Sequence, residues 1–253
     1  MRAIRLQRVS AGLRWGVFAL ALAVASLFVT WHALAALDFG YGLWYELIGI
    51  DRTIERYAPA NRYRDGFQLT SEAERARLFG RIVDAIHAGG AGLEGLRYHA
   101  PDGRVLGPLL REPEIVHLRD VAALVRVFEW AGWTALALLV LLAAYARRRR
   151  DVLPPLRHFA GGAAAVLAAV GALLIVAGPV PVFYWLHERI FPPEHPWFFY
   201  YEDSLMSTLM QAPNLFGAIA AVWAALALLV AGLVLWAVGR WLAPARRGDG
   251  EAP

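Results

Sequence analysis

Residues 112–150 read EPEIVHLRDVAALVRVFEWAGWTALALLVLLAAYARRRR. The apolar part of this segment, Val121–Ala146, exceeds the roughly 20 residues that a helix needs to cross the hydrocarbon core of a bilayer. Pro113 suits the first turn of a helix, and no helix-breaking residue separates it from the apolar part. We therefore predict one continuous helix that begins near Glu112 and runs through the membrane.

Three further apolar runs are long enough to span a bilayer, at residues 12–37, 159–186 and 214–242. The hydrophobic fraction of 58% also exceeds that of an ordinary globular domain. These features predict an all-α membrane protein with four transmembrane helices. Between the first two spans, residues 38–120 are expected to form a mainly helical insert with a small β-hairpin. Residues 187–213 form a second, shorter loop.

The orientation of the spans follows from the arginines, which supply all 25 basic residues. Many of them lie in the two termini and in the loop between the second and third spans, whereas in residues 38–120 and 187–213 acidic residues offset or outnumber the arginines. Cytoplasmic flanks collect positive charge. We predict a bacterial inner-membrane protein with both termini in the cytoplasm and residues 38–120 and 187–213 outside. Met1–Arg8 and Ala33-Leu34-Ala35 would also fit a cleaved signal peptide, but the long apolar run favours an uncleaved anchor.

The predicted insert carries local structural signals of its own. Leu43–Tyr57 has the aromatic and aliphatic composition of an interfacial helix. Ser71 and Glu74 predict a capping box at the start of a second helix, which Gly89-Gly90 would end. Asp102-Gly103 lies between two short apolar segments and predicts the turn of a hairpin.

Glu114, His117 and Asp120 are spaced three residues apart and share overlapping faces of the predicted helix that begins near Glu112. A histidine can act as a base near neutral pH, and a carboxylate one turn away can orient it. An ordinary polar turn at the membrane boundary would have the same composition. His187, at the end of the third apolar run, is expected at the same outer boundary.

The residues that follow His187 are rich in aromatic and acidic side chains, including Phe191 and Trp197. This segment is suited to the headgroup zone, either as the cover of a lipid-accessible cleft or as a plain interfacial anchor. Within the second span, Arg126 and Glu129 are spaced to pair on one helix face. Intramembrane ionisable groups usually face the bundle interior, so this pair is expected to support the same site.

Several chemistries are excluded or disfavoured by the residues present. The chain has no cysteine, so disulfides, thiolate metal sites and cysteine nucleophiles are excluded. Neither HExxH nor a paired-histidine spacing occurs, and no metal is predicted. His32, near the end of the first span, is a weaker candidate site residue, and His158 lies on the inner side. A basic, aromatic soluble face is absent, so nucleic acid is not expected as a partner.

Two segments together resemble a known family. They are residues 114–121, EIVHLRDV, and Leu186-His187 with the downstream Phe191, Trp197, Phe198 and the run at 213–216. They look like the signature segments of the lipoprotein intramolecular transacylase family, also known as a family of integral membrane proteins of unknown function. The order of spans and loops is similar as well, so the resemblance covers most of the chain. The sequence departs from the family after His187, where residues 192–196 read PPEHP.

The resemblance implies an acyltransferase that moves an acyl chain from the glycerol sn-2 ester to the N-terminal cysteine amine of a diacylated lipoprotein. It implies catalytic roles for His117, His187 and Asp120 and needs no cofactor. A developing oxyanion would need a donor, for which Arg119 and Arg126 are candidates, and Phe191 and Trp197 would cover the substrate among the membrane lipids. The alternative is a non-catalytic scaffold that binds an envelope partner through the large insert. A transporter is weaker still, because the inner halves of the spans are almost free of polar residues.

Overall fold

The computed structural model describes residues 2–243, with side chains from residue 11 onward. Four helices are long and apolar enough to cross a membrane: the Ala11–Ala35 part of α1 (Arg2–Ala35), α5 (Glu112–Arg149), α6 (Leu156–Ala177) and α9 (Asn214–Leu242). The predicted all-α membrane fold with four spans is therefore confirmed. Arg246 and Arg247, which contributed to the predicted orientation, lie outside the described residues.

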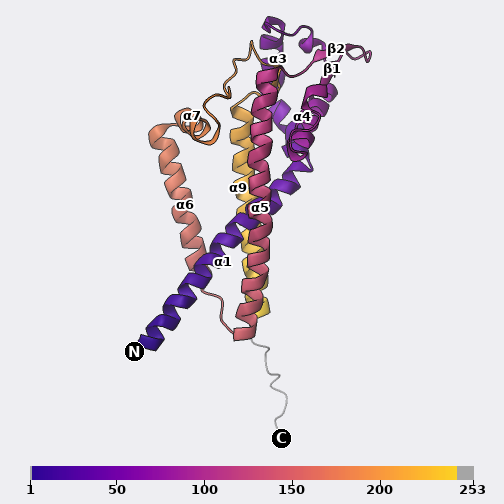
Figure 1. The fold of residues 1–253 in the computed structure, drawn as a ribbon. Coiled ribbons are helices and arrows are strands. Elements are labelled where there is room, and N and C mark those ends of the chain that lie inside the picture. The colour runs from indigo at the N-terminus through magenta and orange to yellow at the C-terminus, as the bar shows by residue number, and fades with distance from the viewer. Residues whose placement is uncertain (1, 244–253) are drawn as a thin grey trace.

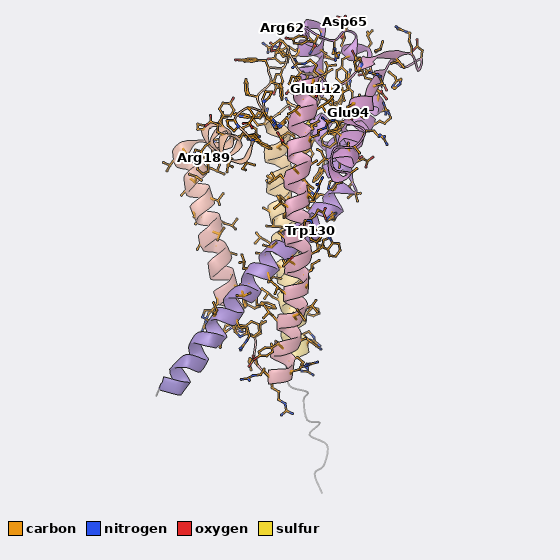
Figure 2. The ribbon with its side chains drawn as sticks, viewed as in Figure 1. Arg62, Asp65, Glu94, Glu112, Trp130 and Arg189 are labelled. Carbon is orange, nitrogen blue, oxygen red and sulfur yellow. The ribbon has the colours of Figure 1, made fainter. Side chains whose placement is uncertain are left out.

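The helix α5 runs the length of the molecule, with α9 beside it and α1 crossing both obliquely (Figure 1). At the crossing of α1 and α5, Gly132 lies so close to Phe28 that a Cβ atom there would come within 2.2 Å of the phenylalanine ring. The first turn of α1 and the last turn of α9 lie at the end of the bundle opposite the insert (Figure 1). Figure 2 shows Arg62, Asp65 and Glu94 at the insert end and Trp130 part-way along α5.

The third apolar run is not one helix, contrary to the expected span at 159–186. The helix α6 ends at Ala177, and α7 (Pro179–Ile190) begins after Gly178, whose backbone has φ 82° and ψ 149°. This conformation is essentially confined to glycine, and the Pro179 nitrogen that follows has no hydrogen to continue the helix. The chain therefore turns after α6, and α7 lies across the end of α6 on the side of the insert (Figure 1).

The insert contains α2 (Tyr41–Leu47), α3 (Ile50–Tyr57), α4 (Glu72–His87), β1 (Arg97–His99), β2 (Val105–Pro108) and four short 3₁₀ turns. These turns are Asp38–Gly40, Ala58–Ala60, Phe67–Leu69 and Leu93–Gly95. The single interfacial helix expected at 43–57 is instead two helices, because Gly49 adopts a left-handed conformation with φ 70°. The predicted hairpin is confirmed as the antiparallel pair β1–β2, with an irregular register between Tyr98 and His99.

One of the two hydrogen bonds of the predicted capping box forms at the start of α4. The Ser71 hydroxyl accepts a hydrogen bond from the Glu74 backbone N–H at 3.2 Å. The Glu74 carboxylate accepts from the His99 backbone N–H at 2.9 Å and from the Arg77 guanidinium, which ties α4 to the hairpin. Although partial burial alone would raise the pKa of Glu74, the hydrogen bonds from Arg77 and His99 hold that pKa below its usual value.

The insert has its own hydrophobic core, which continues into the segment between α7 and α9. Fully buried side chains include Tyr41, Phe67, Leu78 and Tyr98, and they share one cluster with α8 (Leu205–Met210) and the first turns of α9. The Tyr41 hydroxyl donates a hydrogen bond to the Leu209 carbonyl oxygen at 2.8 Å. The insert and this segment thus form one cap over one end of the bundle.

Candidate functional site

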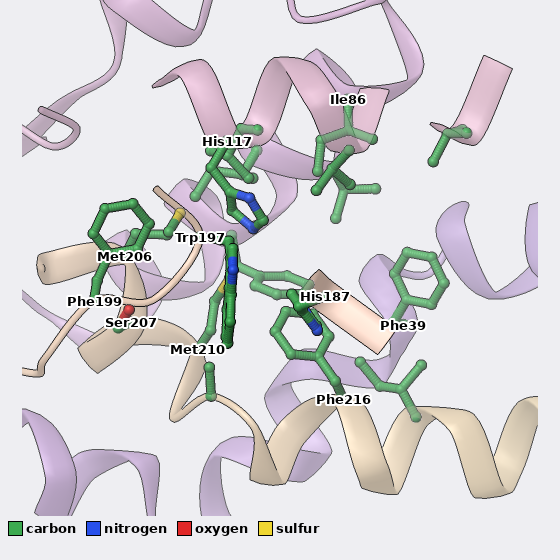
Figure 3. A pocket seen from close by; sticks show the side chains of 18 of the residues that line it. Phe39, Ile86, His117, His187, Trp197, Phe199, Met206, Ser207, Met210 and Phe216 are labelled. Atoms are coloured by element: carbon green, nitrogen blue, oxygen red, sulfur yellow. The ribbon is translucent and has the colours of Figure 1, made fainter. Parts of the chain in front are cut away.

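A cavity of about 340 Å³ lies where α4, α5, α7, α8 and α9 meet beneath this cap (Figure 3). Its wall is mainly apolar, and its titratable side chains are three histidines, His87, His117 and His187. Cavities of this size and polarity are typical of small-molecule or lipid binding. The cavity wall also includes Trp31, Trp197, Phe199, Met206, Ser207 and Phe216.

His117 reaches the cavity because the start of α5 is fixed by Glu114. The Glu114 side chain is completely buried, and its carboxylate accepts hydrogen bonds from the Arg111 backbone N–H at 2.6 Å and from the Ser204 hydroxyl. This contact locks the first turn of α5 against α8. The Nδ1 atom of His117 is buried and has no hydrogen-bond partner among the described residues, so one ring nitrogen is left for a ligand.

His187 reaches the same cavity from α7. Its Nδ1 atom lies 2.8 Å from the Phe183 carbonyl oxygen, and a carbonyl can only accept, so Nδ1 carries the hydrogen. The Nε2 atom therefore holds a lone pair in the neutral ring. Burial of the side chain lowers the pKa of His187 below its ordinary value of 6.5. The neutral form, which can accept a proton, is thus favoured.

The two histidines face each other among aromatic side chains. The centroids of the His117 and His187 rings are 6.3 Å apart. The ring of Phe191 lies against both, with centroid distances of 4.9 Å to His117 and 5.2 Å to His187. The centroid of the Trp197 ring lies 4.9 Å from that of His187. The structure thus brings together four predicted site residues from two segments that are about 70 residues apart in the chain.

Asp120 does not have the partner that its spacing indicated. Its Oδ2 atom lies 2.7 Å from Nδ1 of His195, and no hydrogen bond joins Asp120 to His117 among the described residues. His195 belongs to residues 191–204, which follow α7 and are called here the aromatic loop. The contact with Asp120 holds the aromatic loop against α5, close to the two facing histidines.

The predicted Arg126–Glu129 pair is also wrong. Glu129 pairs with His32, whose Nε2 atom lies 3.1 Å from Oε1, and Arg126 lies beside Gly89 at the end of α4. Arg119 forms an ion pair with Glu94 in the insert. Neither arginine is among the described residues that line the cavity.

Some residues of the site carried no sequence signal. His87 is the last residue of α4, and nothing in its local sequence separates it from an ordinary basic residue at a helix end. Phe199 and Ser207 line the cavity only because the segment between α7 and α9 folds back onto α4 and α5. Beside the cavity, His32, His87 and Glu129 form the one group of the described residues that could hold a metal ion.

No family model matches the sequence, and no curated protein is similar to it in sequence. The fold, however, is similar to solved structures of the membrane-integral lipoprotein intramolecular transacylase Lit from Bacillus cereus. A single-residue variant of that protein superposes with a TM-score of 0.65 over 95% of this chain and 95% of the other, at 13% identity. A second structure of Lit gives a TM-score of 0.63 over 91% and 94% of the two chains, at 14% identity. The chain therefore has the four-span fold of a membrane-integral lipoprotein transacylase.

Proposed function

We propose that this protein is a membrane acyltransferase that modifies a bacterial lipoprotein. It moves an acyl chain from the sn-2 ester of the diacylglyceryl group to the α-amine of the N-terminal cysteine. The observation that carries this proposal is the pair of imidazoles, His117 and His187, which face one apolar cavity from separate helices. We place the cavity at the outer face of the inner membrane, where the lipid-linked end of such a substrate lies.

The reaction needs one proton to move, and the described tautomer of His187 suits that task. The neutral cysteine amine attacks the ester carbonyl carbon, a C–N bond forms and the carbon–oxygen bond to the glycerol breaks. The lone pair on Nε2 of His187 takes the proton that the amine loses and returns it to the leaving sn-2 oxygen. Such general acid–base catalysis contributes about 10²–10⁴-fold to a rate.

His117 is proposed to act from the opposite side of the reacting carbonyl. Its unpartnered nitrogen is available to the carbonyl oxygen or to the amine. The ester and the amine belong to one molecule that is anchored in the bilayer, so holding them together supplies a further part of the acceleration. The aromatic loop, with Phe191 and Trp197 against the two rings, excludes water and thereby disfavours hydrolysis of the ester.

Mass spectrometry of a model diacylated lipoprotein tests this function. The lipoprotein is co-expressed with the wild type, with His117→Ala or with His187→Ala, and its N-terminal peptide is analysed. We expect the wild type to place an acyl group on the cysteine amine and to leave one fewer on the glycerol. The two variants should lower the yield of this product by about 10²-fold or more.

His158→Ala is the matched control, because this histidine is exposed at the start of α6 and lies away from the cavity. It should retain the full yield of the transferred product. An unchanged lipoprotein in the presence of folded wild-type protein would rule the proposal out and would favour a scaffold role for the outer cap.

A further inference from the structure

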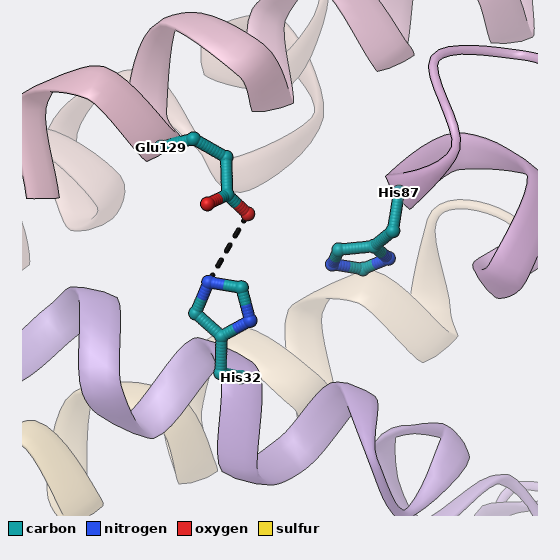
Figure 4. A group of neighbouring side chains, drawn as sticks. All are labelled: His32, His87 and Glu129. Atoms are coloured by element: carbon teal, nitrogen blue, oxygen red, sulfur yellow. Dashed lines mark ion pairs between the residues drawn. The ribbon is translucent and has the colours of Figure 1, made fainter. Parts of the chain in front are cut away.

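Three side chains from three different helices converge beside the cavity: His32 in the last turn of α1, His87 at the end of α4 and Glu129 in α5 (Figure 4). One potential ligand atom from each lies within 4.8 Å of the other two. The Nε2 atom of His32 is 3.1 Å from Oε1 of Glu129, and the centroids of the two imidazole rings are 6.0 Å apart. Separations of this size allow one ion to be bound by all three after small side-chain rotations.

The hydrogen bonds of His87 leave its Nε2 atom as a ligand. Its Nδ1 atom lies 2.9 Å from the Val83 carbonyl oxygen, so Nδ1 donates and Nε2 holds the lone pair. Metal-binding histidines commonly have their second N–H held by a backbone carbonyl in this way. In the structure the lone pair accepts a hydrogen bond from the Trp31 indole N–H at 3.0 Å. That contact is a neutral hydrogen bond, which a metal ion could replace.

His32 also has a nitrogen atom that could bind a ligand. Its Nε2 atom is buried and has no aligned hydrogen bond among the described residues, although the Glu129 carboxylate is near. Glu129 and His32 both lie within membrane-spanning helices, where an ionisable group is costly unless it is paired or coordinated. A simple ion pair between His32 and Glu129 would account for two of the three residues. The lone pair of His87 beside them is occupied only by the neutral hydrogen bond from Trp31.

We propose that His32, His87 and Glu129 bind a divalent transition-metal ion, with Zn²⁺ as the best match. Two neutral imidazoles and one glutamate are a donor set used by zinc sites that keep a fourth position for water or another ligand. The carboxylate offsets part of the charge of the ion in a region of low dielectric. The bound ion would join α1, α4 and α5.

The consequence for the cavity is geometric. His87 and Trp31 are both part of its wall, so an ion on His87 would fix this part of the wall. It would also release the Trp31 indole from its hydrogen bond. This inference rests on the ligand geometry alone and does not depend on the proposed acyl transfer.

The experiment uses the full chain, purified in detergent without an affinity tag and freed of metal by a chelator. Zn²⁺ is added in a calorimetric titration, and Co²⁺ is added in a parallel titration that records visible absorption. We expect a single equivalent to bind, and Zn²⁺ to raise the unfolding temperature and change the tryptophan fluorescence. His32→Ala, His87→Ala and Glu129→Gln should each weaken binding by at least about 10-fold.

Two controls separate this site from other histidines and from loss of folding. Trp31→Phe should bind the metal at least as tightly as the wild type but with a smaller change in fluorescence. It removes the reporting indole and the hydrogen bond that competes with the ion for Nε2 of His87. The double variant His117→Ala/His187→Ala should bind as the wild type does, although acyl transfer would be lost. Glu129→Gln preserves size and hydrogen bonding, and its elution on size exclusion shows whether it is folded. Absence of binding by the wild type, or binding that only the double variant abolishes, would overturn the proposal.

Discussion

His187 is held in one tautomer by a single backbone carbonyl, and this makes its protonation state testable. Because burial lowers its pKa below 6.5, the neutral base persists into mildly acidic solution. We expect the imidazole of His187 to titrate with a midpoint below 6.5. The NMR signals of its ring protons, assigned by comparison with His187→Gln and followed between about pH 5 and pH 8, would show it. The rate of acyl transfer reports it less directly, because the α-amine of the substrate must also lose a proton, at about pH 7.7–8.0. A midpoint above 6.5 would contradict the assignment of His187 as a base held neutral by burial.

The lowered pKa of His187 also affects the stability of the fold. The pKa of His187 is lower in the folded than in the unfolded protein, so the unfolded chain binds more protons in acid. Its stabilising contribution is therefore present above 6.5 and is lost as the pH falls through the folded-state pKa. In His187→Gln, which does not titrate, this part of the pH dependence should disappear from thermal unfolding curves.

The Asp120–His195 contact makes a separate prediction at the residue scale. If Asp120 acts by holding the outer loop through His195, then Asp120→Asn, His195→Ala and the double variant should all weaken the apparent substrate affinity to a similar degree. A double-mutant cycle would give a coupling of about 0.5–3 kcal/mol. If Asp120 instead served His117, the two substitutions would be additive and the effect would fall on the turnover rate.

Among the elements, the crossing of α1 and α5 depends on Gly132. Adding a methyl group there places a carbon 2.2 Å from the ring of Phe28, so the helices must separate or the ring must move. Gly132→Ala should lower stability by about 1–3 kcal/mol, measured as a shift in thermal unfolding in detergent. Gly171→Ala is the control, because no atom lies within 4 Å of the added methyl in α6. The effect should largely vanish in the Phe28→Ala background.

The elements also show what the sequence could and could not predict. The start of α5 was predictable because Pro113 marks it, and the absence of a helix breaker indicated that the helix continues into the apolar run at 121–146. The helix ends slightly later than that run, at Arg149. The break at Gly178 was not, because the apolar composition of residues 159–186 reports affinity for lipid and not whether the helix is continuous.

Part of the candidate site was likewise predictable from the sequence, and part was not. His117 and His187 could be assigned to one boundary because each follows from the end of a span. The contacts of His87, His195 and Glu129 join residues far apart in the chain, and no local spacing encodes them.

For the whole molecule, the predicted orientation can be tested with introduced cysteines, because the chain contains none of its own. Asp102→Cys, at the exposed tip of the hairpin, should react with a membrane-impermeant maleimide in intact spheroplasts. His158→Cys, at the opposite end of the bundle, should react only after the membrane is made permeable. The reverse pattern would place the cavity on the cytoplasmic side.

The helix α6 stands apart from the other spans, and none of its residues is buried in the protein. Its 22 residues extend for about 33 Å, close to the ~30 Å thickness of an average hydrocarbon core. Since lipid surrounds this helix more than protein does, its tilt follows the thickness of the bilayer. α7 continues from its outer end, so a change in tilt moves His187 relative to His117. The thickness of the surrounding membrane would therefore change the distance between the two histidines. The rate of acyl transfer should vary with the acyl-chain length of the host lipid.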